Sequence, residues 1–183
     1  MSEPKRTPKG RAADFVGALR RARNDRGKLA ALRRGLTANP RMHVDAWPVV
    51  AGLGGDIGVD GKSVCVTIAA LFASHPEESN ARNFGETCRR IAHGDGNEIA
   101  ESFERRFRRL LACGDVADVI DQLRAWVRLA ASKGVGVNYE SLFDDLRRWP
   151  WYAENIRVQW ARSFWQSGNV PAETEQPATI AQP

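Results

Sequence analysis

Residues 115–134, DVADVIDQLRAWVRLAASKG, form the most regular helical pattern of the chain. The apolar residues in this stretch are Val116, Val119, Ile120, Leu123, Trp126, Val127 and Ala130. Because they recur every three or four positions, they lie on one face of an α-helix. Asp115 is suited to cap the start of this helix, and the glycine-bearing turn that begins at Lys133 ends it. The stretch therefore predicts an amphipathic helix with one buried face.

Most of the remaining chain shows the same three-to-four-residue spacing. We expect further helices at residues 14–22, 25–36, 44–50, 63–74, 82–93, 97–113, 138–148 and 152–166. Asn138 is placed to cap one of them, and Pro150 to break it. The run from Val64 to Ile68 would also suit a strand. The prediction is an all-α fold: a helical bundle, or two small packed bundles.

The two ends of the chain differ from this helical body. Residues 1–10 are polar and basic and contain two prolines, and residues 168–183 contain prolines and glutamates without any apolar period. We expect a disordered basic arm at residues 1–10 and a disordered tail at residues 168–183. Residues 11–167 then form one all-helical domain, as a single body or as two lobes, with a glycine-rich loop at residues 52–61.

Composition narrows the class of protein further. The chain has 183 residues, of which 43% are hydrophobic, and it is long enough to bury a core. Its three cysteines, Cys65, Cys88 and Cys113, fit neither a disulfide framework nor a zinc site. We expect each of them to be a small buried side chain, which suits a protein of the reducing cytoplasm. No run approaches the ~20 apolar residues that span a bilayer, so we expect no membrane contact.

Net charge points to an anionic partner. The formal charge is +5 and the isoelectric point about 9.5. In the expected helix at residues 97–113, an apolar stripe is formed by Ile99, Phe103, Phe107, Leu110 and Leu111. At about 100° per residue, Arg105 and Arg109 point away from that stripe, and Arg106 and Arg108 flank it.

An earlier helix repeats this arrangement. Leu29, Leu32 and Leu36 face inward, Arg34 points away from them, and Arg26 and Arg33 lie along the flank. A guanidinium group keeps its charge and can grip a phosphate through two hydrogen bonds. The outward arginines therefore favour nucleic-acid contact, and an ordinary solvated helix surface is the alternative.

Catalytic and metal-binding patterns are weak. Gly61-Lys62-Ser63 resembles the end of a phosphate-binding loop, but Asp56 stands where that motif needs a glycine. His43, His75 and His93 are scattered, without metal-ligand spacing. We expect no catalytic residue, no metal and no cofactor.

The six tryptophans are numerous for this length. Trp126 and Trp160 occupy core positions of their helices. Trp149 and Trp151 flank Pro150 at the expected helix break and are predicted to be partly exposed, where they would stack on bases or anchor a protein interface.

Several motifs occur in an order typical of one known family. They are residues 25–36 (DRGKLAALRRGL), 71–76 (LFASHP), 83–85 (NFG), 104–111 (ERRFRRLL), 122–124 (QLR) and 160–165 (WARSFW). Together they resemble the CasB family, the small subunit of the type I-E CRISPR Cascade complex. The resemblance covers roughly residues 14–166.

This resemblance implies an all-α, non-catalytic subunit made of two small bundles. It implies two copies, arranged head to tail, between the backbone subunits that hold the CRISPR RNA and the large subunit. Base pairing between guide RNA and target supplies the specificity. The small subunits would hold the opened duplex by gripping the displaced, single-stranded target DNA.

The same resemblance suggests nucleic-acid-binding residues. The basic positions of the family motifs are matched by Arg33, Arg34, Arg105, Arg106 and Arg124. Arg82 falls where the family has a basic loop, and helix geometry adds Arg109. Some of these arginines could form ion pairs within the protein instead, and Glu101 with Arg105 is one candidate.

Two other classes of protein fit the sequence less well. A small helical metal-dependent nuclease would need clustered carboxylates or histidines, which the chain does not offer. A helical DNA-binding regulator would present asparagine, glutamine and serine to base edges, whereas the exposed faces here are nearly pure arginine.

Overall fold

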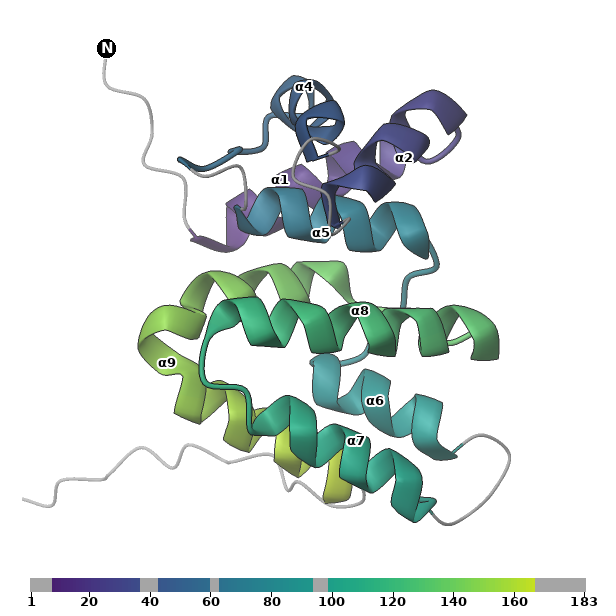
Figure 1. Cartoon of the computed structure of the whole chain (residues 1–183), viewed down its shortest axis with the longest axis vertical. Coiled ribbons are helices and arrows are strands. Elements are labelled where there is room, and N and C mark those ends of the chain that lie inside the picture. The colour runs from purple at the N-terminus through teal and green to yellow at the C-terminus, as the bar shows by residue number, and fades with distance from the viewer. Residues whose placement is uncertain (1–7, 37–42, 60–62, 94–98, 167–183) are drawn as a thin grey trace, which may run out of the picture.

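The computed structural model describes residues 8–36, 43–59, 63–93 and 99–166, and its helices stack in two groups (Figure 1). The first group contains α1 (Pro8–Arg21), α2 (Arg26–Arg33), α4 (Trp47–Gly52) and α5 (Val64–Ser74). The second contains α6 (Phe84–His93), α7 (Glu101–Leu111), α8 (Val116–Lys133) and α9 (Tyr139–Trp165). Short 3-10 turns cover Arg34–Leu36 and Val44–Ala46. The all-α prediction is confirmed.

Helix α5 is the centre of the first group. Residues 66–73 are all buried, because α1, α2, α4, α8 and α9 surround the helix. A helix that is apolar on every side has to be enclosed in this way. The strand alternative for Val64–Ile68 is therefore wrong. The Ser63 hydroxyl caps the helix by accepting a hydrogen bond from the Val66 amide at 3.2 Å.

Helices α6 and α9 form the closest pair in the second group. Gly85 lies against the backbone of Trp160, where a Cβ atom would overlap the Trp160 carbonyl. Farther along α9, the ring of Phe164 stacks on Phe107 of α7 with 4.0 Å between centroids. These contacts hold α7, which carries the arginine cluster, against the core.

The two groups are joined where the segment after α5 meets the turn before α9. Glu78 and Val137 form an isolated parallel bridge. Nearby, the buried His75 ring donates from Nε2 to the Val135 carbonyl at 2.8 Å, and the Tyr139 hydroxyl donates to the His75 carbonyl. Burial raises the pKa of Tyr139 far above its ordinary value, so this hydroxyl stays a donor. The junction is therefore a set of hydrogen bonds between the two groups.

The predicted helix starts at Asp115 and Asn138 are confirmed. The carboxylate of Asp115 accepts from the Asp118 amide at 2.9 Å, and the side chain of Asn138 accepts from the Ser141 amide at 3.0 Å. Helix α8 ends at Gly134, whose φ of 65° lies in the left-handed region. Caps of this kind satisfy backbone groups that a helix end leaves without partners.

Two expected helix ends are displaced in the structure. Helix α1 begins at Pro8, six residues before the expected start at Asp14, so residues 8–10 of the expected disordered arm are helical. Proline is tolerated in a first turn because its missing N–H would have no partner there. The break expected at Pro150 is present two residues later: the range of α9 joins two helical stretches across a kink at Tyr152, whose φ of −130° and ψ of 25° are not helical.

The prediction that Trp149 is partly exposed is wrong. The side chain is 2% exposed, because its ring packs 5.4 Å from that of Trp160 and lies under the guanidinium of Arg157. Trp151, which was expected to be exposed as well, is 75% exposed. Trp126 and Trp160 are buried as predicted.

Some expectations fall outside the described residues. These are residues 1–7 of the predicted arm, the predicted tail at residues 168–183, and residues 60–62 of the glycine-rich loop. Within the described ranges, no helix combines the length and apolar character needed to cross a bilayer. Cys88 and Cys113 are buried and Cys65 is half-buried, and burial raises the pKa of all three thiols.

Candidate nucleic-acid interface

Three arginines line a cleft of about 250 Å³ between the two helix groups. Arg33 comes from the end of α2, and Arg124 and Arg128 from α8. The other lining residues are Leu71, Ser74, Val127 and Ala131. Arg33 and Arg124 were both predicted from the sequence, and the fold brings them together although they are far apart in the chain.

Arg33 is fixed in place by one of its own donors. Its Nε donates to the Ala73 carbonyl in the last turn of α5, at 2.7 Å. This bond satisfies one of the carbonyls left over at a helix end, and it still leaves the terminal nitrogens of the guanidinium to face the cleft. The side chain is therefore oriented before any ligand arrives.

Arg124 and Arg128 stand one helical turn apart on α8. Arg124 has a weak partner in Asp121, at 3.3 Å, whereas Arg128 is exposed and has no acidic partner among the described residues. Like charges at this spacing repel each other. An anion placed between them would relieve that repulsion, so the cleft suits a phosphate group.

Sequence reasoning missed Arg128. Its position four residues after Arg124, on the same helix, was the signal that could have found it. The family motif ended at Arg124, and helical spacing alone does not say that α2 and α5 would cover this side of α8.

The arginines of α7 form a second basic surface. Phe107 and Leu110 are buried, and Arg105, Arg106, Arg108 and Arg109 are all exposed, as the helical spacing predicted. Arg105 lies 3.7 Å from Glu101, so the expected ion pair is present but loose. Arg106 and Arg109 have no acidic partner in the described part of the chain, which contradicts the alternative of a buried ion pair at Arg106.

Arg108 differs from its neighbours because it has two partners. Its guanidinium lies 5.4 Å from the centre of the Trp165 ring and 3.5 Å from the Glu104 carboxylate. Glu104 in turn accepts from the Trp165 indole at 3.3 Å. These contacts fasten the end of α9 to α7.

Arg34 and Arg82 are engaged within the protein. Arg34 pairs with Asp45 at 2.9 Å, and Arg82 pairs with Glu86 at 3.1 Å. Both side chains are about half exposed, so these ion pairs are open to solvent and worth little. Each arginine can still turn toward a phosphate, at the cost of its present partner.

The two basic surfaces lie on different sides of α8. Lys133 reaches toward α7, with its ammonium 5.2 Å from the centre of the Phe103 ring. Arg124 precedes Lys133 by nine residues, which is about 180° around the helix. The predicted residues therefore divide into the cleft arginines and the α7 arginines, with Arg34 and Arg82 outside both.

The described residues contain no group of three histidine, cysteine or acidic side chains arranged to hold a metal ion. His75 is engaged in the junction, and Gly61 and Lys62 lie outside the described part of the chain. The chemistry that these surfaces offer is the binding of anions by fixed positive charge.

This fold and these surfaces define the class of the protein. It is all-helical, and its outward arginines form two groups. The chain belongs to the Cse2 family: the family model described as "CRISPR-associated protein Cse2" matches residues 28–165. The resemblance to the CasB family is thereby confirmed.

Individual relatives agree with this assignment. The CRISPR-associated protein Cse2 of Thermus thermophilus is 27% identical over 172 residues, which cover 93% of this chain and 97% of the relative. The crystal structure of CasB from Thermus thermophilus has a TM-score of 0.68 at 26% identity and covers 88% of this chain and 100% of that one.

A third match comes from a structure described as a CRISPR RNA-guided surveillance complex. One of its chains has a TM-score of 0.68 at 22% identity, with 87% of this chain and 94% of that chain covered. At that identity the likeness is one of fold.

Proposed function

We propose that this protein is a non-catalytic subunit of a type I-E Cascade complex that stabilises opened target DNA by holding the displaced strand. Membership of the Cse2 family supports the assignment to a CRISPR system, and the fold it shares with a chain of an RNA-guided surveillance complex supports a place in such an assembly. The partners would be the backbone and large subunits, a second copy of the chain, the CRISPR RNA and single-stranded target DNA.

The observation that carries this proposal is the arginine cleft. Arg33 is pre-oriented by its bond to Ala73, and Arg128 has no acidic partner among the described residues. Guanidinium groups that have no base-contacting side chains beside them bind a nucleic acid through its phosphates, so they position it without recognising its sequence. Reading the sequence is then left to the guide RNA.

The α7 arginines would extend this contact along the strand. Arg106 and Arg109 are exposed on a helix whose position is fixed by the stacking of Phe107 on Phe164. A strand that touched both surfaces would pass from one side of α8 to the other. Two copies of the chain in one assembly would offer a longer track than one.

The free protein allows the first experiment. We expect weak, sequence-tolerant binding of single-stranded DNA whose log affinity falls with log salt by about 0.7 per phosphate contacted. Binding that does not depend on salt, or that strongly prefers one duplex sequence, would favour a regulator instead.

Incubation of the protein with labelled DNA and Mg²⁺ should give no cleavage. Cleavage that survives purification and is abolished by a carboxylate or histidine substitution would identify a nuclease.

A further inference from the structure

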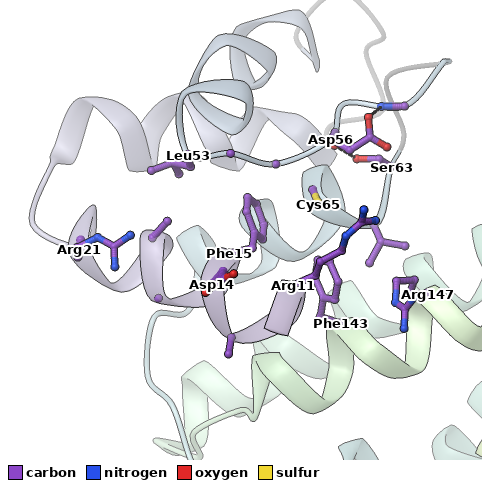
Figure 2. A pocket seen from close by; sticks show the side chains of 17 residues that line it. Arg11, Asp14, Phe15, Arg21, Leu53, Asp56, Ser63, Cys65, Phe143 and Arg147 are labelled. Atoms are coloured by element: carbon purple, nitrogen blue, oxygen red, sulfur yellow. Dashed lines mark hydrogen bonds between the residues drawn. The ribbon is translucent and has the colours of Figure 1, made fainter. Parts of the chain in front are cut away.

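A larger groove, of about 1480 Å³, lies away from the arginine cleft, between α1, the segment after α4 and α9 (Figure 2). Arg11 and Arg21 line it from α1, and Arg147 lines it from α9. Figure 2 shows Arg11 extending from α1 toward the segment that carries Asp56 and Ser63. None of the residues predicted from the sequence to bind nucleic acid lines this groove.

The positive charges of the groove are not neutralised by ion pairs within the described residues. Arg11, Arg21 and Arg147 have no ion-pair partner there, although Asp14 and Asp56 lie in the same walls. The Nε atom of Arg147 is shielded from solvent and has no hydrogen-bond acceptor among the described residues. Because none of the three arginines has an acidic partner there, the groove offers positive charge to a ligand.

Two aromatic rings of the core lie beneath the groove. The rings of Phe15 and Phe143 have 6.0 Å between their centroids, and each is only 4% exposed. Gly55 allows the wall to approach these rings, because a Cβ atom at that position would overlap the Phe15 ring. The open surface of the groove is therefore mainly polar, with arginines in its walls, and arginine is enriched at protein–protein interfaces.

An exposed aromatic side chain follows the groove residue Arg147 on α9. Trp151 is 75% exposed and follows Arg147 by four residues on α9, so the two lie on one face of the helix. The helix is regular through Trp151, because the kink is at Tyr152, which is itself 55% exposed. Exposed tryptophan and tyrosine beside a cleft are typical anchors of protein interfaces.

We infer that this groove, together with Trp151 one helical turn farther along α9, receives an acidic peptide segment of another subunit. This inference rests on the proposed function for the source of the partner. A nucleic-acid strand fits less well, because the carboxylates of Asp14 and Asp56 lie among the three arginines and would repel successive phosphates. A peptide can place single carboxylates opposite the arginines and away from the two aspartates.

The test uses two surface variants that leave the core intact, Arg11→Glu/Arg21→Glu and Trp151→Ala. The control is Arg162→Glu, an exposed arginine on the far half of α9 that does not line the groove. Each variant is titrated into a Cascade complex that lacks this subunit, and native mass spectrometry measures its incorporation. Single-strand affinity of the free proteins and their melting temperatures are measured in parallel.

The expected result is at least a tenfold higher subunit concentration for half-incorporation of both groove variants, with the control like the parent. Trp151→Ala should also keep its single-strand affinity within about twofold, since it removes no charge. Normal incorporation of both variants would overturn the inference, and normal incorporation with lost strand affinity would assign the groove to nucleic acid. If the parent itself does not incorporate, the proposed function fails, and the assignment of the partner fails with it.

Discussion

Removing Arg124 and Arg128 together should weaken single-strand binding in a way that depends on salt. Each arginine offers one phosphate contact in the cleft, and neither is deeply engaged elsewhere: Arg124 has only Asp121 at 3.3 Å, and Arg128 has no acidic partner among the described residues. Each lost contact should cost on the order of 1 kcal/mol at low salt. The double variant should therefore bind about 30-fold more weakly at 50 mM salt.

The salt dependence gives a second, independent number. Two phosphate contacts contribute about 1.4 to the slope of log affinity against log salt for a single strand. Between 50 and 200 mM salt, the defect of the double variant should therefore shrink about sevenfold, to roughly fourfold. Fluorescence anisotropy with a labelled oligonucleotide, measured over a salt series, gives both the defect and the slope.

A matched control separates local contact from net charge. Arg23 is also an exposed arginine, but it already pairs with Glu77 at 2.7 Å and does not line the cleft. Arg23→Ala should leave the salt slope unchanged within about 0.3. If the double variant and the control have the same slope as the parent, the cleft arginines are an ordinary solvated surface and the reasoning is wrong.

Three further predictions concern stability, each measured by urea denaturation. Burial would raise the pKa of Glu86, but hydrogen bonds from Arg82 and Arg90 lower it overall from 4.5. Glu86→Gln should therefore lower the free energy of unfolding by about 1–2 kcal/mol at pH 7. This difference from the parent should persist down to about pH 4.5 and disappear as the pH falls through the lowered pKa, and a difference that does not change with pH would contradict this. Gly85→Ala should cost about 3 kcal/mol or more, because its methyl group meets the Trp160 backbone, and a loss under about 1 kcal/mol would count against that packing. Trp160→Phe should cost about 1–3 kcal/mol by removing the donor to the buried Asp145 carboxylate, 2.8 Å from the indole, and unchanged stability would show that this bond adds nothing.

The helices were largely predictable because their causes are local. The three-to-four-residue spacing identified α8, and the side chains of Asp115 and Asn138 marked two helix starts that the structure confirms. The outward direction of the α7 arginines followed from the same arithmetic. The break near Pro150 was predictable for the same reason, since the backbone becomes non-helical at Tyr152, two residues after the proline. The burial of Trp149 was not predictable, because it depends on Trp160 and Arg157 from farther along the chain.

The cleft could not be found from the sequence because its causes are long-range. Arg33 is oriented by a carbonyl forty residues away, at Ala73, and Arg128 joins it only because α8 packs beside α5. Helical spacing says which way a side chain points from its own axis, and it does not say which other helix will face it. The division of the predicted arginines into two surfaces has the same origin.

The central claim, that outward arginines hold the displaced strand, is tested most directly by target-duplex opening. A Cascade complex is reconstituted with the parent subunit or with Arg33, Arg34, Arg105 and Arg109 changed to alanine, and opening is followed at two salt concentrations. These side chains lie on exposed faces, so the variant should fold and assemble. We predict that it opens the duplex less stably, by a similar factor for every target sequence and with a smaller dependence on salt. Opening equal to that of the parent at both salt concentrations would contradict the account.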